Sequence, residues 1–282
     1  MTEANQVPQK VGVLGGGRMG AGIAHSFLAA GAEVTVVDIN DEAVAAAAER
    51  ISNDVDGSLR RGAEGTREEW LSRLTVTTDT GAFAGLPLVV EAVPESMDLK
   101  ISSFRKIAEA SPEAVIATNT SSLSVSDLAL TVDNDVIGLH FFNPVPASKL
   151  VEIVVADSTP EKLVDEARGW VEALGKTPIV VKDAPGFASS RLGVCIALEA
   201  IRMVEEGVAS PQDIDNAMVL GYKFPVGPLA LTDIVGLDVR LGIAEYLSST
   251  LGDRFAPPQL MRDMVERGEL GRKSGKGFYD YS

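Results

Sequence analysis

Cysteine and histidine are scarce in this sequence, and the scarcity excludes some kinds of site. Cys195 is the single cysteine among 282 residues, and there are two histidines. The chain therefore cannot form an intrachain disulfide or a multi-cysteine metal site. We expect no metal site, and a reducing, cytoplasmic environment.

Positive charge and long apolar runs are scarce as well. The chain has 25 Lys and Arg against 40 Asp and Glu, a formal net charge of −15. Such a field repels phosphate and argues against a nucleic-acid partner. The opening MTEANQVPQK lacks the apolar stretch of a secretory signal. No apolar run approaches the length of about 20 residues that a membrane span needs, so we expect no membrane partner.

The first part of the chain alternates between strand-like and helix-like segments. Helical spacing marks Arg18–Ala30 and Asp41–Arg61. Short apolar runs of strand length are Lys10–Gly15, Glu33–Asp38, Leu86–Val93, Ala114–Thr118, Val136–Phe142 and Thr177–Lys182. This alternation predicts an α/β domain of Rossmann type, with a mostly parallel sheet covered on both faces.

The pattern changes near Pro185, after which strand-like segments give way to helical ones. Helices are predicted at Phe187–Glu206, Pro211–Leu220, Asp233–Leu251 and Pro258–Arg267. We therefore expect an α/β domain over residues 1–184 and an all-α domain over residues 185–282.

A glycine-rich motif follows the first strand and opens the first helix. Its residues are Gly15, Gly16, Gly17, Arg18, Met19 and Gly20, a G-x-G-x-x-G run. The first glycine permits a tight turn, the second lets the backbone approach a pyrophosphate, and the third lets the helix pack closely on the strand. In this setting the motif predicts a dinucleotide site at the helix N-terminus.

Asp38 ends the second strand, where a carboxylate accepts hydrogen bonds from ribose hydroxyls of a dinucleotide. It would repel the additional phosphate of NADP, and no arginine follows to receive one. The sequence favours NAD over NADP. The alternative is a tight strand–helix turn with a capping aspartate and no ligand.

One of the two histidines is placed to act as an acid–base group. His140 ends a predicted strand, and ligands of open α/β sheets bind at the carboxyl ends of strands. A histidine suits proton removal from an alcohol near neutral pH. Glu152 interrupts the apolar run Leu150–Ala156, so it either faces solvent or pairs with a buried group such as His140. His25 lies within the first predicted helix and is interpreted as a surface or packing residue.

Seven segments together resemble the L-3-hydroxyacyl-CoA dehydrogenase family. They are GGGRMGAGIAH, VVEAVPES, NTSSLSV, GLHFFNPVPASKLVEIV, DAPGF, FPVGPLALTDIVGLD and GRKSGKGFYDY. The likeness runs from about Lys10 to the C-terminus, and within the family it is strongest to the bacterial 3-hydroxybutyryl-CoA dehydrogenases.

The resemblance implies a reaction and a set of roles. The reaction is reversible NAD-dependent oxidation of a short-chain (S)-3-hydroxyacyl-CoA, with His140 as catalytic base, Glu152 as its partner and Ser121 on the substrate's 3-oxygen. It also implies a homodimer formed through the helical domain, which carries substrate contacts. The implied cofactor contacts beyond the glycine motif and Asp38 are Glu95, Lys100, Ser121, Asn143 and Lys273.

Two parts of the substrate site fit the family pattern less well. Ser190 stands where the family usually has Asn before Arg, and serine offers its donor and acceptor on a shorter arm. Arg60 and Arg61 are candidates for the CoA phosphates, although such charges more often form a solvated helix face.

Two other functions remain open from the sequence. One is a dehydrogenase of a free hydroxy acid or sugar acid with the same signature. The other is a non-catalytic, structural NAD-binding protein, which would have no need of His140, Glu152 and Ser121 together.

Overall fold

The computed structural model describes residues 6–281, which form two compact units. The first unit ends at Asp183 and the second begins at Ala184. Residues 1–5, where the sequence predicts no secretory signal, lie outside the described part. The two units are described separately below.

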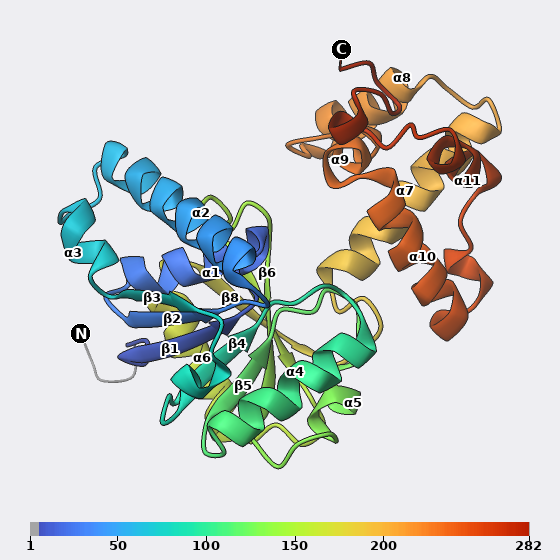
Figure 1. The fold of residues 1–282 in the computed structure, drawn as a ribbon. Helices are drawn as coiled ribbons and strands as arrows, with labels where there is room; N and C mark the ends of the chain where they lie inside the picture. The colour runs from blue at the N-terminus through green and yellow to red at the C-terminus, as the bar shows by residue number, and fades with distance from the viewer. Residues whose placement is uncertain (1–5, 282) are drawn as a thin grey trace. The chain divides into compact units, whose positions relative to one another are not determined.

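A single eight-stranded sheet forms the centre of the first unit (Figure 1). Its strand order is β3-β2-β1-β4-β5-β6-β7-β8. Adjacent strands in this order are parallel, except that β6 and β7 are antiparallel. The mostly parallel sheet predicted from the sequence is confirmed. The strands are β1 (Lys10–Leu14), β2 (Glu33–Val37), β3 (Leu74–Thr77), β4 (Leu88–Glu91), β5 (Val115–Thr118), β6 (Val136–Phe141), β7 (Leu150–Val155) and β8 (Thr177–Lys182).

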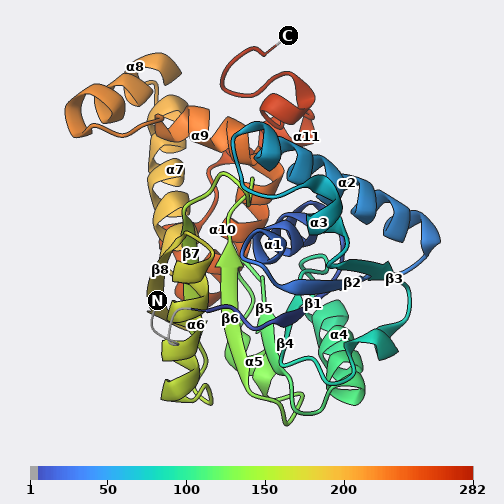
Figure 2. The same ribbon diagram turned by 90° about the vertical axis from the view of Figure 1, so that its left-hand side faces the viewer.

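Helices cover both faces of this sheet. α1, α2 and α6 contribute to one hydrophobic cluster with the strands, whereas α4 and α5 lie on the face opposite α1 and α2 (Figures 1 and 2). The helices are α1 (Arg18–Ala29), α2 (Asp41–Arg60), α3 (Arg67–Leu71), α4 (Met97–Ala110), α5 (Val125–Ala129) and α6 (Glu161–Ala173), with a 3₁₀ turn η1 (Thr80–Phe83). A sheet covered in this way exposes ligand-binding positions mainly at the ends of its strands.

The second unit is helical, as predicted. Within its described residues, strand-like pairing is limited to isolated bridges near Lys276. Its elements are α7 (Ser189–Glu205), α8 (Pro211–Asn216), the π-helical turn η2 (Ala217–Gly221), α9 (Pro228–Val235), α10 (Leu237–Leu251), α11 (Gln259–Glu266) and the 3₁₀ turns η3 (Asp253–Phe255) and η4 (Arg272–Ser274).

Two helix predictions in this unit were wrong in detail. Asp233–Leu251 is not one helix, because Gly236 adopts φ 105° and separates α9 from α10. A left-handed glycine of this kind ends the first helix and reorients the chain. The segment Pro211–Leu220 likewise leaves α-helical geometry after Asn216.

Two buried aspartates fasten the C-terminal segment to the helices of the second unit. Asp215 accepts hydrogen bonds from Leu229 N (2.8 Å) in the first turn of α9 and from the Tyr279 hydroxyl (2.7 Å). Asp233 accepts from Phe278 N and Tyr279 N, both at 3.0 Å. Because buried carboxylates require such partners, these contacts fix the last residues against α9.

Within residues 6–281, no helix combines the length and apolarity needed to cross a membrane.

Candidate active site

The turn between β1 and α1 has the backbone geometry needed to bind the phosphates of a dinucleotide. Gly15 adopts φ 97°, and a Cβ on Gly20 would lie 1.7 Å from the carbonyl oxygen of Gly15, so both positions require glycine. A Cβ on Gly17 would meet nothing within 4 Å, which leaves the backbone open to an approaching group. No side chain caps the N-terminus of α1, so its orphan amides can serve an anion. Arg18 is exposed and Met19 half-buried beside them.

Asp38 lies directly after β2 and binds the same turn. Its Oδ2 accepts a hydrogen bond from Gly16 N at 2.7 Å, and its Oδ1 accepts from Ile39 N at 2.7 Å. The carboxylate is therefore held beside the glycine loop in a fixed orientation. Each oxygen has a second lone pair, which can accept from a ribose hydroxyl. These residues fit the adenosine half of a dinucleotide.

His140 and Glu152 form a buried pair across two antiparallel strands. His140 near the end of β6 lies directly opposite Glu152 of β7, and its Nδ1 is 2.7 Å from Glu152 Oε2. The two side chains are only 7% and 0% exposed. A buried carboxylate at this distance fixes the orientation of the imidazole ring. The arrangement can accept and return a proton.

A carboxylate also organises the serine-rich loop after β5. Glu95 Oε1 lies 2.7 Å from Thr120 Oγ1, and the amides and hydroxyls of Ser121 and Ser122 point to the same oxygen at 2.9–3.1 Å. Burial opposes ionisation of Glu95, but the Lys100 ammonium and these donors outweigh it and lower the pKa of the carboxyl. Ser121 is therefore held in place by Glu95.

Glu91 is a buried charged residue that the sequence analysis missed. It ends β4 with no exposed surface, and its oxygens accept from Lys100 Nζ (2.8 and 3.0 Å) and from Thr118 Oγ1 (2.6 Å). A carboxylate within the apolar run of a central strand was the available signal, because such a group must be paired. The pair joins β4 to α4, and Thr118 connects it to β5.

Lys100 occupies a different environment from the one that its expected cofactor role suggests. Its side chain is 1% exposed, and its ammonium also lies 3.3 Å from Val93 O and 3.5 Å from Glu95 Oε2. The structure thus places Lys100 in the support of Glu95 and Ser121, with all three ammonium hydrogens within reach of protein acceptors.

The other expected site residues lie on several elements of the two units. Asn143 is exposed in the segment after β6, and Arg60 and Arg61 are exposed at the C-terminal end of α2, where Arg61 donates to Ser58 Oγ at 3.1 Å. Ser190 and Lys273 belong to the second unit. Ser190 is the second residue of α7, and the Lys273 ammonium pairs with the carboxylate of Asp238.

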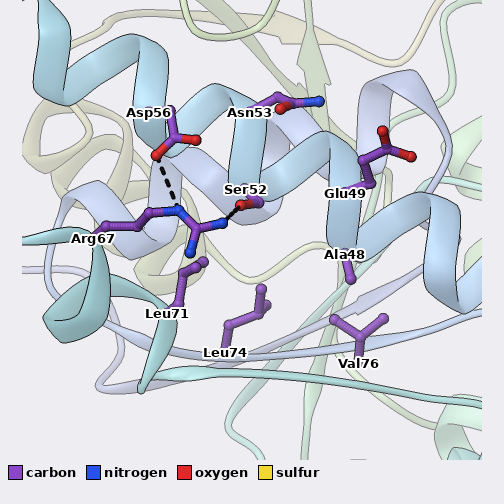
Figure 3. Close-up of a pocket in the computed structure, with 9 residues that line it drawn as sticks. All are labelled: Ala48, Glu49, Ser52, Asn53, Asp56, Arg67, Leu71, Leu74 and Val76. Atoms are coloured by element: carbon purple, nitrogen blue, oxygen red, sulfur yellow. Dashed lines mark hydrogen bonds and ion pairs between the residues drawn. The ribbon is translucent and has the colours of Figure 1, made fainter.

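A surface groove of about 620 Å³ lies between α2, α3 and β3 (Figure 3). Arg67 of α3 is its basic residue, and its guanidinium donates to Asp56 and Ser52 of α2. None of the residues expected in the cofactor, substrate or catalytic site lines this groove, whose nine lining residues are Ala48, Glu49, Ser52, Asn53, Asp56, Arg67, Leu71, Leu74 and Val76.

Comparison with known proteins places this geometry in a family. The model for the NAD-binding domain of 3-hydroxyacyl-CoA dehydrogenase matches residues 10–184, and the model for the C-terminal domain of that enzyme matches residues 186–281. The chain belongs to the 3-hydroxyacyl-CoA dehydrogenase family. As a member it is an oxidoreductase, and its first unit contains the family's NAD-binding domain.

Several relatives match this family member over nearly its whole length. A probable 3-hydroxybutyryl-CoA dehydrogenase of Bacillus subtilis is 39% identical over 279 residues, covering 97% of each chain. A 3-hydroxybutyryl-CoA dehydrogenase of Mycobacterium tuberculosis is 40% identical, covering 97% of this chain and 98% of its own. The crystal structure of (S)-3-hydroxybutyryl-CoA dehydrogenase from Ralstonia eutropha superposes with a TM-score of 0.93 at 37% identity, over 98% of this chain and 100% of the other.

Proposed function

We propose that this protein catalyses the reversible NAD-dependent oxidation of (S)-3-hydroxybutyryl-CoA, or another short-chain (S)-3-hydroxyacyl-CoA, to the 3-oxoacyl-CoA. The observation that carries the proposal is the buried pair of His140 and Glu152 at the carboxyl end of β6, 2.7 Å apart. The similarity to 3-hydroxybutyryl-CoA dehydrogenases supplies the substrate class.

His140 is the general acid–base group of this reaction. Because Nδ1 faces the Glu152 carboxylate, we assign the exchange of the hydroxyl proton to Nε2. Glu152 keeps the ring in the tautomer with a proton on Nδ1 and stabilises the imidazolium that forms on oxidation. NAD, when bound, supplies the hydride acceptor. Ser121, held by Glu95, contacts the substrate's 3-oxygen.

Asp38 supports NAD rather than NADP as the cofactor. Its carboxylate is fixed by Gly16 N and Ile39 N, so it cannot turn away from a phosphate placed at the ribose. Two carboxylate oxygens beside an added phosphate would repel it. Gly15 to Gly20, Glu95, Asn143 and Lys273 complete the proposed cofactor contacts.

Two further parts of the proposal concern the substrate and the assembly. Arg60 and Arg61 provide exposed positive charge for the phosphates of CoA within an acidic chain, and Ser190 takes the substrate-holding place on α7. Leu231, Ile234 and Val235 form an exposed apolar stripe on α9, 38–43% exposed. Such a stripe supports a homodimer formed through the helical unit.

The proposal is tested by following the reduction of acetoacetyl-CoA, first with NADH and then with NADPH. The expected result is turnover that is faster with NADH. His140→Gln should lower kcat about 10²- to 10⁴-fold while NAD binding, followed by fluorescence titration, stays unchanged. Arg105→Gln, on the exposed face of α4, is the matched control.

The other outcomes separate the alternative functions. Turnover of free acetoacetate but not of its CoA ester indicates a free hydroxy-acid dehydrogenase. NAD binding without turnover of any 3-oxo compound indicates a non-catalytic protein. A loss in His140→Gln of less than about tenfold, against the range expected of a general base, removes this residue from the acid–base role.

A further inference from the structure

Asn119 connects the serine-rich loop after β5 to the strand that carries His140. Its side-chain Oδ1 accepts a hydrogen bond from Phe141 N at 2.8 Å. Phe141 directly follows His140 in β6, and Asn119 lies shortly before Ser121 in the loop. One side chain of the first unit thus joins the segment of the proposed acid–base group to the segment of the proposed substrate contact.

This hydrogen bond continues the pairing of β5 with β6 beyond the end of β5. The last residue of β5 is Thr118, which pairs with Gly138, so Phe141 lies beyond the part of β6 that pairs with β5. A buried backbone amide requires an acceptor, and Phe141 is only 2% exposed. The oxygen of Asn119 supplies this acceptor at the point where the main chain leaves the sheet.

The same loop is held from the opposite side by residues of β4 and of the segment after it. The N–H of Asn119 donates to Glu91 O at 2.9 Å, and Glu95 accepts the hydrogen bonds of Ser121. Because β5 lies between β4 and β6 in the sheet, these contacts hold the loop toward β4. The bond to Phe141 N holds it toward β6.

We propose that Asn119 is a positioning residue that sets the spacing between Ser121 and His140, so that both can contact the same substrate oxygen. This inference rests on the proposed function, in which His140 exchanges the proton of the 3-hydroxyl and Ser121 binds its oxygen. A shift of one group relative to the other lowers the rate, since a misplacement of about 1 Å can cost about 10²-fold.

The test follows the reduction of acetoacetyl-CoA by NADH in Asn119→Leu, which removes the acceptor and keeps the approximate size of the side chain. Its kcat should fall about 10²-fold. The KM for NADH should stay within about threefold of the wild-type value, because the glycine motif and Asp38 are unchanged.

Two further variants make the test independent of how well one substitution folds. Asn119→Ala removes the same acceptor with a smaller side chain and should show the same loss of kcat. Asn119→Asp keeps an oxygen acceptor at this position, so its kcat should be at least about tenfold above that of Asn119→Leu.

A double-mutant cycle shows whether Asn119 acts through Ser121. In the Ser121→Ala background, Asn119→Leu should lower kcat less than about threefold, because no serine remains to be positioned. Equal losses in the two backgrounds would show that the effect of Asn119 is independent of Ser121, which overturns the proposal.

Asn134→Leu is the matched control for stability. Asn134 precedes β6 at the opposite end of the same two strands, and its Nδ2 donates to Ser111 O, Pro112 O and Ala114 O at 2.8–3.2 Å. This variant should lower the urea midpoint at least as much as Asn119→Leu, while its kcat stays within about twofold of the wild type.

The remaining outcomes overturn the proposal in distinguishable ways. Wild-type kcat in Asn119→Leu, or equal kcat in Asn119→Leu and Asn119→Asp, shows that the acceptor does not position the site. Equal losses of kcat in Asn119→Leu and Asn134→Leu show that activity follows general stability. A wild type that does not reduce acetoacetyl-CoA refutes the proposed function, and the positioning role is then refuted with it.

Discussion

The two histidines are both buried in the first unit, but they have opposite electrostatic neighbours. His140 faces a carboxylate, whereas His25 is near the positive charges of Arg61 and Lys176. Burial first, and then these two cations, lower the pKa of His25 to about 4. Its Nε2 lies 2.9 Å from Ser58 Oγ, and its buried Nδ1 has no hydrogen-bond partner within residues 6–281. The surroundings of His25 therefore favour its neutral form.

The protonation of His25 makes stability depend on pH. Its pKa in the folded protein is below the ordinary value of 6.5, so the unfolded chain binds the proton more readily. The contribution to stability is complete above pH 6.5 and is lost as the pH falls toward 4. Between pH 7 and 5, the wild type should lose about 2 kcal/mol more of its free energy of unfolding than His25→Gln.

Urea unfolding of the wild type and of His25→Gln at pH 7 and at pH 5 measures this difference. His140→Gln, which replaces the other histidine, serves as a second control. Equal losses in wild type and His25→Gln would show that folding does not lower the pKa of His25.

At the residue scale, site residues could be predicted from the sequence where their partners are close in the sequence. Residues whose environment is made by elements far away in the sequence were missed. The glycine motif and Asp38 belong to one strand–turn–helix segment, and the structure brings Asp38 onto Gly16 N. The environments of Glu91 and Arg240 are formed by residues on other elements. No spacing in the sequence shows that Glu91 is paired by Lys100, or that Nε of Arg240 has no hydrogen-bond partner among residues 6–281.

At the scale of elements, most strands were predicted because a parallel sheet buries them as continuous apolar runs. The helix α6 was missed, although Leu163, Ala167, Trp170 and Val171 are buried at helical spacing and would have indicated it. The break at Gly236 was missed because apolar residues continue with helical spacing on both sides. A lone glycine inside a helical pattern does not by itself mark an end.

The buried pair of Glu91 and Lys100, with Thr118, joins β4, α4 and β5, and its loss should destabilise the first unit. Glu91→Gln leaves the Lys100 ammonium buried without its full counter-charge, which should lower the free energy of unfolding by about 3 kcal/mol. Glu33→Gln breaks the exposed pair with Lys10 and is the matched control, with an expected loss below about 1 kcal/mol.

Urea denaturation measures both losses. The double variant Glu91→Leu/Lys100→Met should recover much of the stability, because apolar side chains can replace a buried ion pair. Similar small losses in Glu91→Gln and Glu33→Gln would show that the buried pair contributes no more than a surface pair.

At the scale of the whole molecule, the second unit has a group of exposed apolar side chains on α9. Leu231, Ile234 and Val235 share one side of α9, and Val239 of α10 is 45% exposed. Isolated exposed apolar residues are ordinary, but three on one helical face within eight residues suggest a contact surface. The sequence predicted a homodimer through this unit only by family resemblance, because exposure cannot be derived from composition.

Ile234→Glu should therefore shift the protein from dimer to monomer in sedimentation velocity, because a charge placed in an apolar contact opposes association. Leu130→Glu replaces an 84% exposed leucine of the first unit and should leave the mass unchanged. A wild type that sediments as a monomer, or an Ile234→Glu variant that stays dimeric, would contradict this surface.

The antiparallel pairing of β6 and β7 has a consequence for how this site tolerates change during evolution. The distance between His140 and Glu152 is fixed by cross-strand register and not by the connecting segment, since the two residues are directly opposite in the sheet. Insertions or deletions between Asn143 and Lys149 can therefore change the segment that follows His140 without separating His140 from Glu152. A slip of one residue along the strand, in contrast, would turn Glu152 to the other face. Natural variants of this enzyme should accordingly differ in the length of that connection. The separation of twelve residues between the histidine and the glutamate should be kept only where the connection has the same length.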